Sequence, residues 1–255
     1  MEEKTQTAKR RRGIYLLPNL FTTAALFAGF YAITAAMNQQ YEMAAIAIYV
    51  AMVLDGLDGR VARLTNTQSA FGAEYDSMAD MISFGAAPAL VMYAWVLSGL
   101  GKLGWVAAFV HAAGAALRLA RFNTQIGTAD KRYFQGLPSP SAAAILAGLV
   151  WVSATHGLSG ESLRYVAAGL AVATGLLMVS NFRYYSFKDI DLRGRVSFIW
   201  AILIMLVFAF MFTNPPLVLF TLSTLYAISG PALTLARRRK MRSEKASSKG
   251  GGGMA

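Results

Sequence analysis

The chain contains no cysteine among its 255 residues, which excludes disulfide bonds and thiolate metal sites. It has only two histidines, His111 and His156, too few for a histidine-rich metal centre. Charge is scarce as well, since 15% of the residues are charged whereas a soluble domain carries about 25%. The charges gather at the two ends and in short connections, with long apolar stretches between them. We therefore expect lipid rather than water to surround most of the chain.

Eight apolar stretches are each long enough to cross a bilayer, which takes about 20 residues in a helix. They cover residues 16–36, 42–63, 70–98, 102–121, 138–156, 162–181, 195–213 and 215–236. The first is too long for a cleaved signal, and another follows it almost at once. The sequence therefore predicts an all-α, polytopic membrane helical bundle of about eight transmembrane helices over residues 14–236. A basic N-terminal tail (1–13) and a basic, flexible C-terminal tail (237–255) flank it.

Lysine and arginine are distributed unevenly along this pattern. With eight spans and both termini in the cytoplasm, all of the 24 basic residues except Lys102 and Arg164 fall on the cytoplasmic side. A span count wrong by one would scatter the pattern, so we expect both termini to be cytoplasmic. In a chain this apolar, the net charge of +11 indicates contact with anionic membrane lipids, and no nucleic-acid partner is expected.

Carboxylates lie where a membrane helix normally has none. Five of the 13 acidic residues fall between positions 55 and 80, in the second and third predicted spans, and each acid near the bilayer centre costs about 3 kcal/mol to insert. Asp55 and Asp58 are three residues apart and so share one helix face. Asp76 and Asp80, four apart, share a face of the next helix. The polar connection 64–70 turns the chain back, so we expect the two faces to meet.

Four hard oxygen ligands without cysteine or histidine nearby favour Mg²⁺, Mn²⁺ or Ca²⁺. A site that also binds a diphosphate suits Mg²⁺ or Mn²⁺, and two ions would neutralise four carboxylates and still attract phosphate. Spacing alone leaves a second use of the same acids open, as the proton or cation pathway of a membrane transporter. A transporter has no evident need for the small residues and arginine beside the acids, and the sequence shows no clear internal repeat.

Small residues accompany the acids on both helices. They are Gly56, Gly59, Ala62 and Gly72. Small side chains let a bulky ligand or another backbone approach closely, and for Gly59 plain helix–helix packing is the alternative interpretation. Arg60 and Arg63 lie near the same end and are candidates to hold phosphate oxygens or to pair with the acids.

The stretch 55–80, DGLDGRVARLTNTQSAFGAEYDSMAD, resembles the signature of the CDP-alcohol phosphatidyltransferases. Eight fixed positions of that signature are all present: Asp55, Asp58, Gly59, Ala62, Arg63, Gly72, Asp76 and Asp80. The resemblance implies transfer of a phosphatidyl group from a CDP-linked lipid to an alcohol, with CMP as the leaving group. It also implies two Mg²⁺ or Mn²⁺ ions held by the four aspartates, with Asp80 as the catalytic general base that takes the proton of the attacking hydroxyl.

Further roles follow from the same resemblance. The expected surface for the CDP nucleotide consists of Gly56, Gly59, Ala62, Gly72 and, for the diphosphate, Arg63. Glu74 lies outside the signature, and we expect a structural or surface role for it. The family resemblance also implies a homodimer in a bacterial or archaeal cytoplasmic membrane, with the active site facing the cytoplasm.

Three other stretches resemble the integral-membrane phosphatidylserine synthases within this family: residues 14–22, 116–123 and 134–140. They imply CDP-diacylglycerol as the donor and L-serine as the acceptor. Arg118 and Arg121 are three residues apart at the cytoplasmic end of the fourth span, where arginines can hold a carboxylate, and Asn123 and Ser139 offer neutral polar contacts. Two alternatives stay open: the arginines only flank the membrane, or they hold the phosphate of glycerol 3-phosphate or of an inositol phosphate.

Overall fold

The structure is a computed structural model that describes residues 16–250 except 66, 68, 125–132 and 186–197. Side chains of residues 236–250 are not among those described. The predicted N-terminal tail at 1–13 and the end of the C-terminal tail therefore lie outside the described residues.

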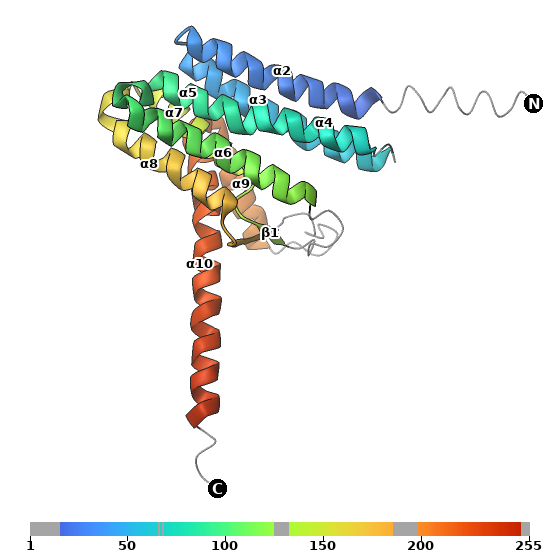
Figure 1. The fold of residues 1–255 in the computed structure, drawn as a ribbon, viewed down its shortest axis with the longest axis vertical. Helices are drawn as coiled ribbons and strands as arrows, with labels where there is room; N and C mark the ends of the chain where they lie inside the picture. Colours follow the sequence, from blue (N-terminus) through green and yellow to red (C-terminus); the bar gives the residue numbers. More distant parts are fainter. Residues whose placement is uncertain (1–15, 66, 68, 125–132, 186–197, 251–255) are drawn as a thin grey trace, which may run out of the picture.

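The described chain is mostly helical (Figure 1). In chain order the helices are α2 (Leu16–Met37), α3 (Tyr41–Leu64), α4 (Ala70–Asp80), the π-helix η1 (Met81–Ala86), α5 (Ala87–Trp95), the 3-10 helix η2 (Leu97–Leu100), α6 (Lys102–Thr124), α7 (Ser139–Thr155), α8 (Gly160–Val179), α9 (Phe198–Thr213) and α10 (Pro215–Gly250). Two short antiparallel strands, β1 (Tyr133–Gln135) and β2 (Arg183–Tyr185), pair with Phe134 opposite Tyr184.

The helices follow the predicted spans closely, with α4, η1 and α5 together forming the third. The last differs most, because α10 continues past the predicted end at residue 236 to Gly250. Within the described residues, five helical segments are long and apolar enough to cross a membrane: Asn19–Met37, Ala70–Trp95, Lys102–Thr124, Gly160–Val179 and Pro215–Leu235. The prediction of a helical membrane bundle is thus confirmed, while the count of eight spans and the cytoplasmic termini stay predictions.

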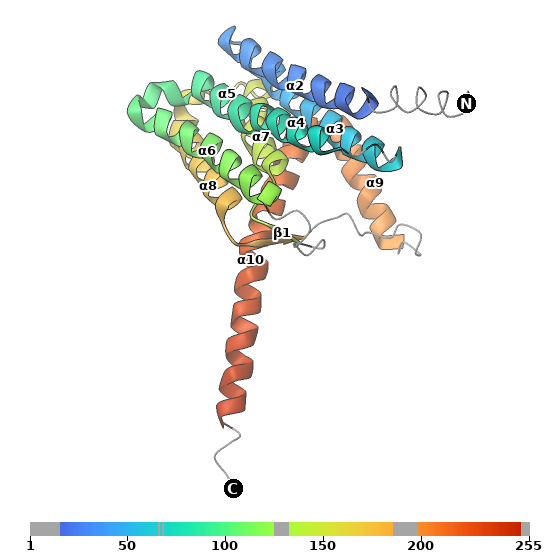
Figure 2. The same ribbon diagram turned by 45° about the vertical axis from the view of Figure 1, so that its right-hand side comes forward.

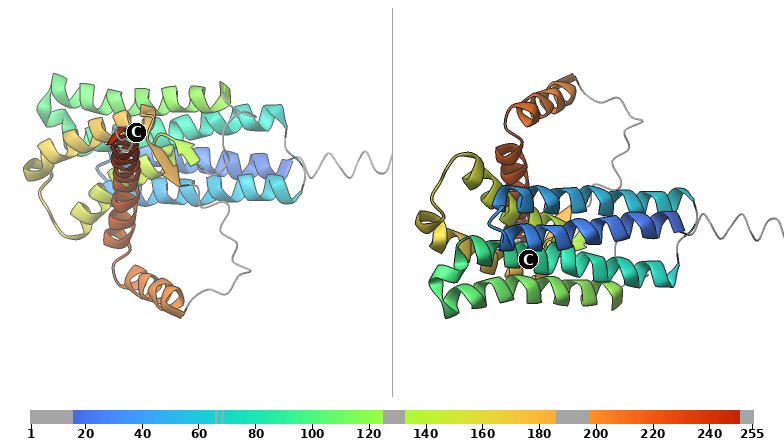
Figure 3. Two further views of the ribbon diagram at one scale, coloured as in Figure 1. Left: turned by 90° about the horizontal axis from the view of Figure 1, so that it is seen from below. Right: turned by 90° about the horizontal axis from the view of Figure 1, so that it is seen from above.

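Helices α2, α3, α4–α5 and α6 run side by side in one row (Figures 1 and 2). Helix α10 packs against α7 and then extends away from the row, and α9 lies against α10 outside the row (Figure 3). The row is therefore the part of the fold that carries the acidic signature.

Small side chains build the core between α2, α3 and α7. Alanines of α2 and α3 are buried, among them Ala44 and Ala51 with no exposed surface, and small residues let membrane helices approach closely. Residues 142–150 of α7 are buried on all sides, and the Tyr49 hydroxyl donates a hydrogen bond to the Ala144 carbonyl at 2.8 Å. Helix α3 is thereby fixed against the centre of the bundle.

The β1–β2 pair ties the start of α7 to α8 and α10. Gly136 has a φ of 77°, and a Cβ there would collide with the Met178 carbonyl oxygen, so the position requires glycine. The Tyr184 hydroxyl donates to the Ala227 carbonyl at 3.0 Å. Burial raises the pKa of Tyr184 to about 12, so this hydroxyl stays protonated and remains a donor. Ser139, the first residue of α7, follows directly and is held in place.

Candidate metal centre

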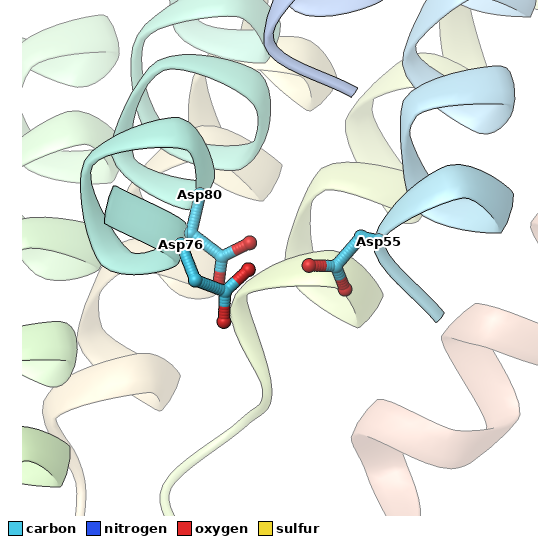
Figure 4. Close-up of side chains that lie close together, drawn as sticks. All are labelled: Asp55, Asp76 and Asp80. Atoms are coloured by element: carbon cyan, nitrogen blue, oxygen red, sulfur yellow. The ribbon is translucent and has the colours of Figure 1, made fainter. Parts of the chain in front are cut away.

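Three of the predicted metal ligands converge between α3 and α4. One carboxylate oxygen each of Asp55, Asp76 and Asp80 lies within 4.8 Å of the other two. Figure 4 shows Asp55 on α3 pointing toward Asp76 and Asp80, which project together from α4. The two acidic helix faces therefore meet, as the spacing of the four aspartates predicts.

Asp58 takes a different position from the other three acids. Its side chain is buried, with 5% of its surface exposed, and its Oδ2 accepts a hydrogen bond of 2.7 Å from the Thr22 hydroxyl of α2. It also lies within hydrogen-bonding reach of Asp76. Asp58 thus borders the three-acid group and links it to α2.

One cation reaches the cluster from the side of α6. The Arg118 guanidinium interacts electrostatically with Asp80 and Asp55, and its Nη1 donates a hydrogen bond of 2.5 Å to the Ser139 hydroxyl. Arg63 interacts in the same way with Asp58. Among the described residues these two arginines cannot neutralise four neighbouring carboxylates, so negative charge is left over.

Asp76 has a buried carboxylate oxygen for which no partner is described. Its Oδ1 is buried and has no hydrogen-bond partner among the described residues. A buried carboxylate oxygen without a partner is costly. A divalent cation would satisfy it, because Mg²⁺ and Mn²⁺ bind carboxylate oxygens, and no thiolate or imidazole belongs to the group. The residues present therefore fit a hard divalent metal ion.

The predicted small residues differ in what surrounds them. A Cβ at Gly56 would meet no atom within 4 Å, and one at Gly59 would meet only Nη1 of Arg63, at 3.6 Å. At Gly72 the space is already used, since a Cβ would lie 3.1 Å from the Ser69 hydroxyl, which caps α4 by accepting from the Gly72 amide. The open face beside the acids is thus on α3, and Gly72 serves the start of α4.

The four residues predicted to bind the acceptor make three different sets of hydrogen bonds. Arg118 and Ser139 bond to each other beside the acids. Arg121 donates from Nη1 to the Ser180 carbonyl at 3.3 Å, at the end of α8. Asn123 donates from Nδ2 to the Ser77 hydroxyl at 3.1 Å, on the residue after Asp76. The pair Arg118–Ser139 therefore lies nearest to the metal centre.

Two residues at the site were not predicted as site residues. Thr22 lies in the stretch 14–22 that resembles a family motif, and this resemblance is the sequence signal that points to Thr22, which contacts Asp58. Tyr226 of α10 interacts electrostatically with Arg118, and nothing in its local sequence distinguishes it from other span residues. Its place depends on how α10 packs across the bundle.

Comparison with known proteins gives a consistent result. The sequence profile of the CDP-alcohol phosphatidyltransferase family matches residues 15–220. The CDP-diacylglycerol–serine O-phosphatidyltransferase of Helicobacter pylori (strain J99) is 39% identical over 218 residues, which are 85% of this chain and 90% of that protein. The protein of the same name from Mycobacterium tuberculosis (strain H37Rv) is 38% identical over 67% of this chain and 62% of its own length. The one from Methanocaldococcus jannaschii is 37% identical over 56% of this chain and 63% of its own length.

Proposed function

The chain belongs to the CDP-alcohol phosphatidyltransferase family, and on this basis we propose that it transfers the phosphatidyl group of CDP-diacylglycerol to the hydroxyl of L-serine, giving phosphatidylserine and CMP. The observation that carries the proposal is the convergence of Asp55, Asp76 and Asp80 beside Arg118. The match over residues 15–220 and the names of the relatives favour this transferase over a transporter.

The four aspartates would hold the metal ions, which we propose to be two Mg²⁺ or Mn²⁺ ions. When bound, such ions neutralise the diphosphate of the donor and stabilise the charge that develops on the departing CMP. The unpaired Oδ1 of Asp76 and the three oxygens within 4.8 Å of one another support this role. Asp58 would join from the edge of the group, where Thr22 orients its carboxylate.

Asp80 would accept the proton of the attacking serine hydroxyl. It stands at the end of α4, with Arg118 nearby on the side of α6. A carboxylate can act as the general base when the hydroxyl loses its proton late, in the transition state. The interactions of Asp80 with Asp55 and with Arg118 support its contact with both donor and acceptor.

The nucleotide would lie along the open face of α3. Gly56 and Gly59 leave space there for a close approach of the CDP group, and the absence of a described helix against Gly59 favours ligand approach over helix packing at this position. Ala62 continues this face, and Arg63 would contact the diphosphate. Gly72, whose space is used by the cap of α4, would border the site from the other helix.

The acceptor would bind between α6 and the start of α7. Arg118 and Ser139 form one polar pair beside the acids, where the guanidinium can hold the serine carboxylate. Arg121 and Asn123 would shape the wall of this pocket through their bonds to α8 and α4. The names of the relatives favour serine over glycerol 3-phosphate or an inositol phosphate as the acceptor.

The setting in the membrane follows from the arginines at the site. The basic residues at the C-terminal ends of α3 and α6 support a cytoplasmic position for that end of the bundle, by the positive-inside rule. We therefore propose an enzyme of a bacterial or archaeal cytoplasmic membrane with its active site on the cytoplasmic side, in contact with anionic lipids. A homodimer is proposed from the family resemblance, and the net charge of +11 is assigned to the lipid surface rather than to a nucleic acid.

The test is CMP release by the purified protein with CDP-diacylglycerol, Mg²⁺ or Mn²⁺, and one acceptor at a time. Metal-dependent release with serine, lost in Asp80→Asn, is the expected result. Glu74→Gln is the matched control, because Glu74 is an exposed acid on the same helix outside the cluster. Release with glycerol 3-phosphate or an inositol phosphate instead of serine would overturn the acceptor, and no release with any acceptor would overturn the reaction.

A further inference from the structure

The helix that carries Asp76 and Asp80 changes its winding directly after the second acid. Helix α4 ends at Asp80, and the π-helix η1 occupies Met81–Ala86 before α5 begins. The Ala87 amide bonds to the Ile82 carbonyl, five residues back. A π-turn inserts one residue, which rotates the helix before it relative to the helix after it by about 100°. The direction in which Asp80 points therefore depends on this turn being kept.

Pro88 removes one amide donor from this turn. It has no N–H, so the Phe84 carbonyl cannot accept a hydrogen bond from the residue four positions on, as it would in an α-helix. Within a bilayer an unsatisfied backbone carbonyl is costly, because no water is at hand to replace the donor. A donor from another helix can therefore stabilise the Phe84 carbonyl at this turn.

His111 of α6 supplies that donor. Its Nε2 lies 3.2 Å from the Phe84 carbonyl oxygen, and its side chain has no exposed surface. A carbonyl only accepts hydrogen bonds, so Nε2 carries the proton. The other nitrogen, Nδ1, lies 2.8 Å from the Thr174 hydroxyl of α8, within hydrogen-bonding distance. The imidazole of α6 therefore connects the π-turn to α8.

Close helix packing brings these groups together. A Cβ on Gly114 of α6 would lie 2.5 Å from the Gly175 carbonyl oxygen of α8, so the two backbones touch beside Thr174. A Cβ on Gly85 of η1 would lie 3.0 Å from Cβ of Ala115, one turn after His111. The π-turn, α6 and α8 form one packed unit around the imidazole.

We infer that His111 is a positioning residue of the metal centre: its bond to the Phe84 carbonyl holds the π-turn and thereby aims Asp76 and Asp80 at Asp55. On the other side of the turn, the Ser83 hydroxyl donates to the Ala25 carbonyl of α2 at 3.1 Å. The turn is thus fixed between α2 and α6. The inference rests on the proposed function in one respect, that the three acids bind a divalent metal ion.

The test compares two amides of different reach. In His111→Gln the side-chain N–H can reach the Phe84 carbonyl, whereas in His111→Asn it is one methylene too short. Binding of Mn²⁺ to the purified protein is measured without lipid or serine, from the electron paramagnetic resonance signal of free Mn²⁺. Loss of a residue that orients metal ligands typically costs about 10- to 100-fold in affinity, and we expect such a loss for His111→Asn and recovery of most of it for His111→Gln.

Tyr41→Phe is the matched control for general destabilisation. It removes the bond of 3.1 Å from the Tyr41 hydroxyl to the Ala94 carbonyl, at the far end of α5. We expect its Mn²⁺ affinity to equal that of the wild type. Hydrogen exchange of the amides of residues 81–86 is the second measurement, and it should accelerate in His111→Asn more than in His111→Gln or Tyr41→Phe.

Equal Mn²⁺ affinity of the Asn and Gln variants, or an equal loss in Tyr41→Phe, would overturn the role of His111. Failure of the proposed function looks different, because the wild type would then bind Mn²⁺ no better than Asp76→Asn does. If Mn²⁺ binding requires Asp76 but is the same with Asn or Gln at position 111, the metal centre is supported and only the role of His111 is excluded.

Discussion

The two halves of α3 pack in opposite ways. From Ala44 to Ala51 the helix presents buried alanines to its neighbours, and no residue of that stretch is charged. From Asp55 onward it presents carboxylates and glycines, and a Cβ at Gly56 would meet no atom within 4 Å. The change takes place within a single turn, between Ala51 and Asp55.

The contrast shows how a membrane helix can serve both as framework and as binding surface. Dense packing of the first half fixes the helix axis, because small side chains leave no room for it to shift. The second half then holds its acids opposite α4, with Asp58 buried against α2 and open space left beside Gly56. The open space beside Gly56 would be filled by the CDP group of the donor rather than by side chains.

The largest effect is expected from removing the proposed general base, Asp80, which faces the second half of α3. Asp80→Asn should lower the turnover of CDP-diacylglycerol by between about 10² and 10⁴-fold, the usual contribution of a general base. The fold should persist, because the amide has nearly the same shape and removes one of several repelling charges. CMP release and thermal unfolding of the same preparation check both statements. A variant that turns over at wild-type rate would exclude Asp80 as the base.

Metal removal tests whether metal ions bind between the acids of α3 and α4. At a Mn²⁺ concentration of 100 times its dissociation constant, the wild type should gain about 2.7 kcal/mol of unfolding free energy. Asp76→Asn should lose most of this gain, since the unpaired Oδ1 of Asp76 is the oxygen that most needs a cation. Thermal unfolding with Mn²⁺ and with chelator gives the two values. Glu74→Gln, exposed on the same helix, should behave as the wild type.

A matched pair of leucine substitutions sharpens the contrast within α3. Ala51→Leu overfills the packed half and should destabilise the protein by about 1–3 kcal/mol. Gly56→Leu, one turn on, meets open space and should leave stability unchanged or slightly raised, since leucine favours helix over glycine. Its effect should instead be a raised KM for CDP-diacylglycerol. Equal destabilisation by both substitutions would show that the second half is packed as well.

Much of this arrangement was open to prediction from sequence because it depends on local spacing. Apolar stretches of spanning length and the separations of the acids are properties of neighbouring residues, so the helices and the meeting of Asp55 with Asp76 and Asp80 could be anticipated. The contacts of Asp58 with Thr22 and of Arg118 with Tyr226 could not, because they depend on which distant helices become neighbours.

The winding of the third span was missed for a related reason. The sequence predicts a single span over residues 70–98, and the irregularity that Pro88 can introduce is not part of that prediction. The π-turn at 81–86 does not alter hydrophobic periodicity enough to be visible in so apolar a stretch. Its partner His111 is not predicted as a site residue, because the carbonyl to which it bonds belongs to another helix.

The smallest expected effect lies outside α3, at the contact between β2 and α10. Tyr184→Phe removes a buried hydrogen bond to the Ala227 carbonyl and should cost about 1 kcal/mol of unfolding free energy. Turnover should change little, since the ring still packs against Gly230 and keeps α10 in place. Tyr165→Phe, at an exposed position of α8, is the control and should leave stability unaltered. A large loss of turnover in Tyr184→Phe would mean that this bond helps to position Tyr226 and, through it, Arg118 beside the acids.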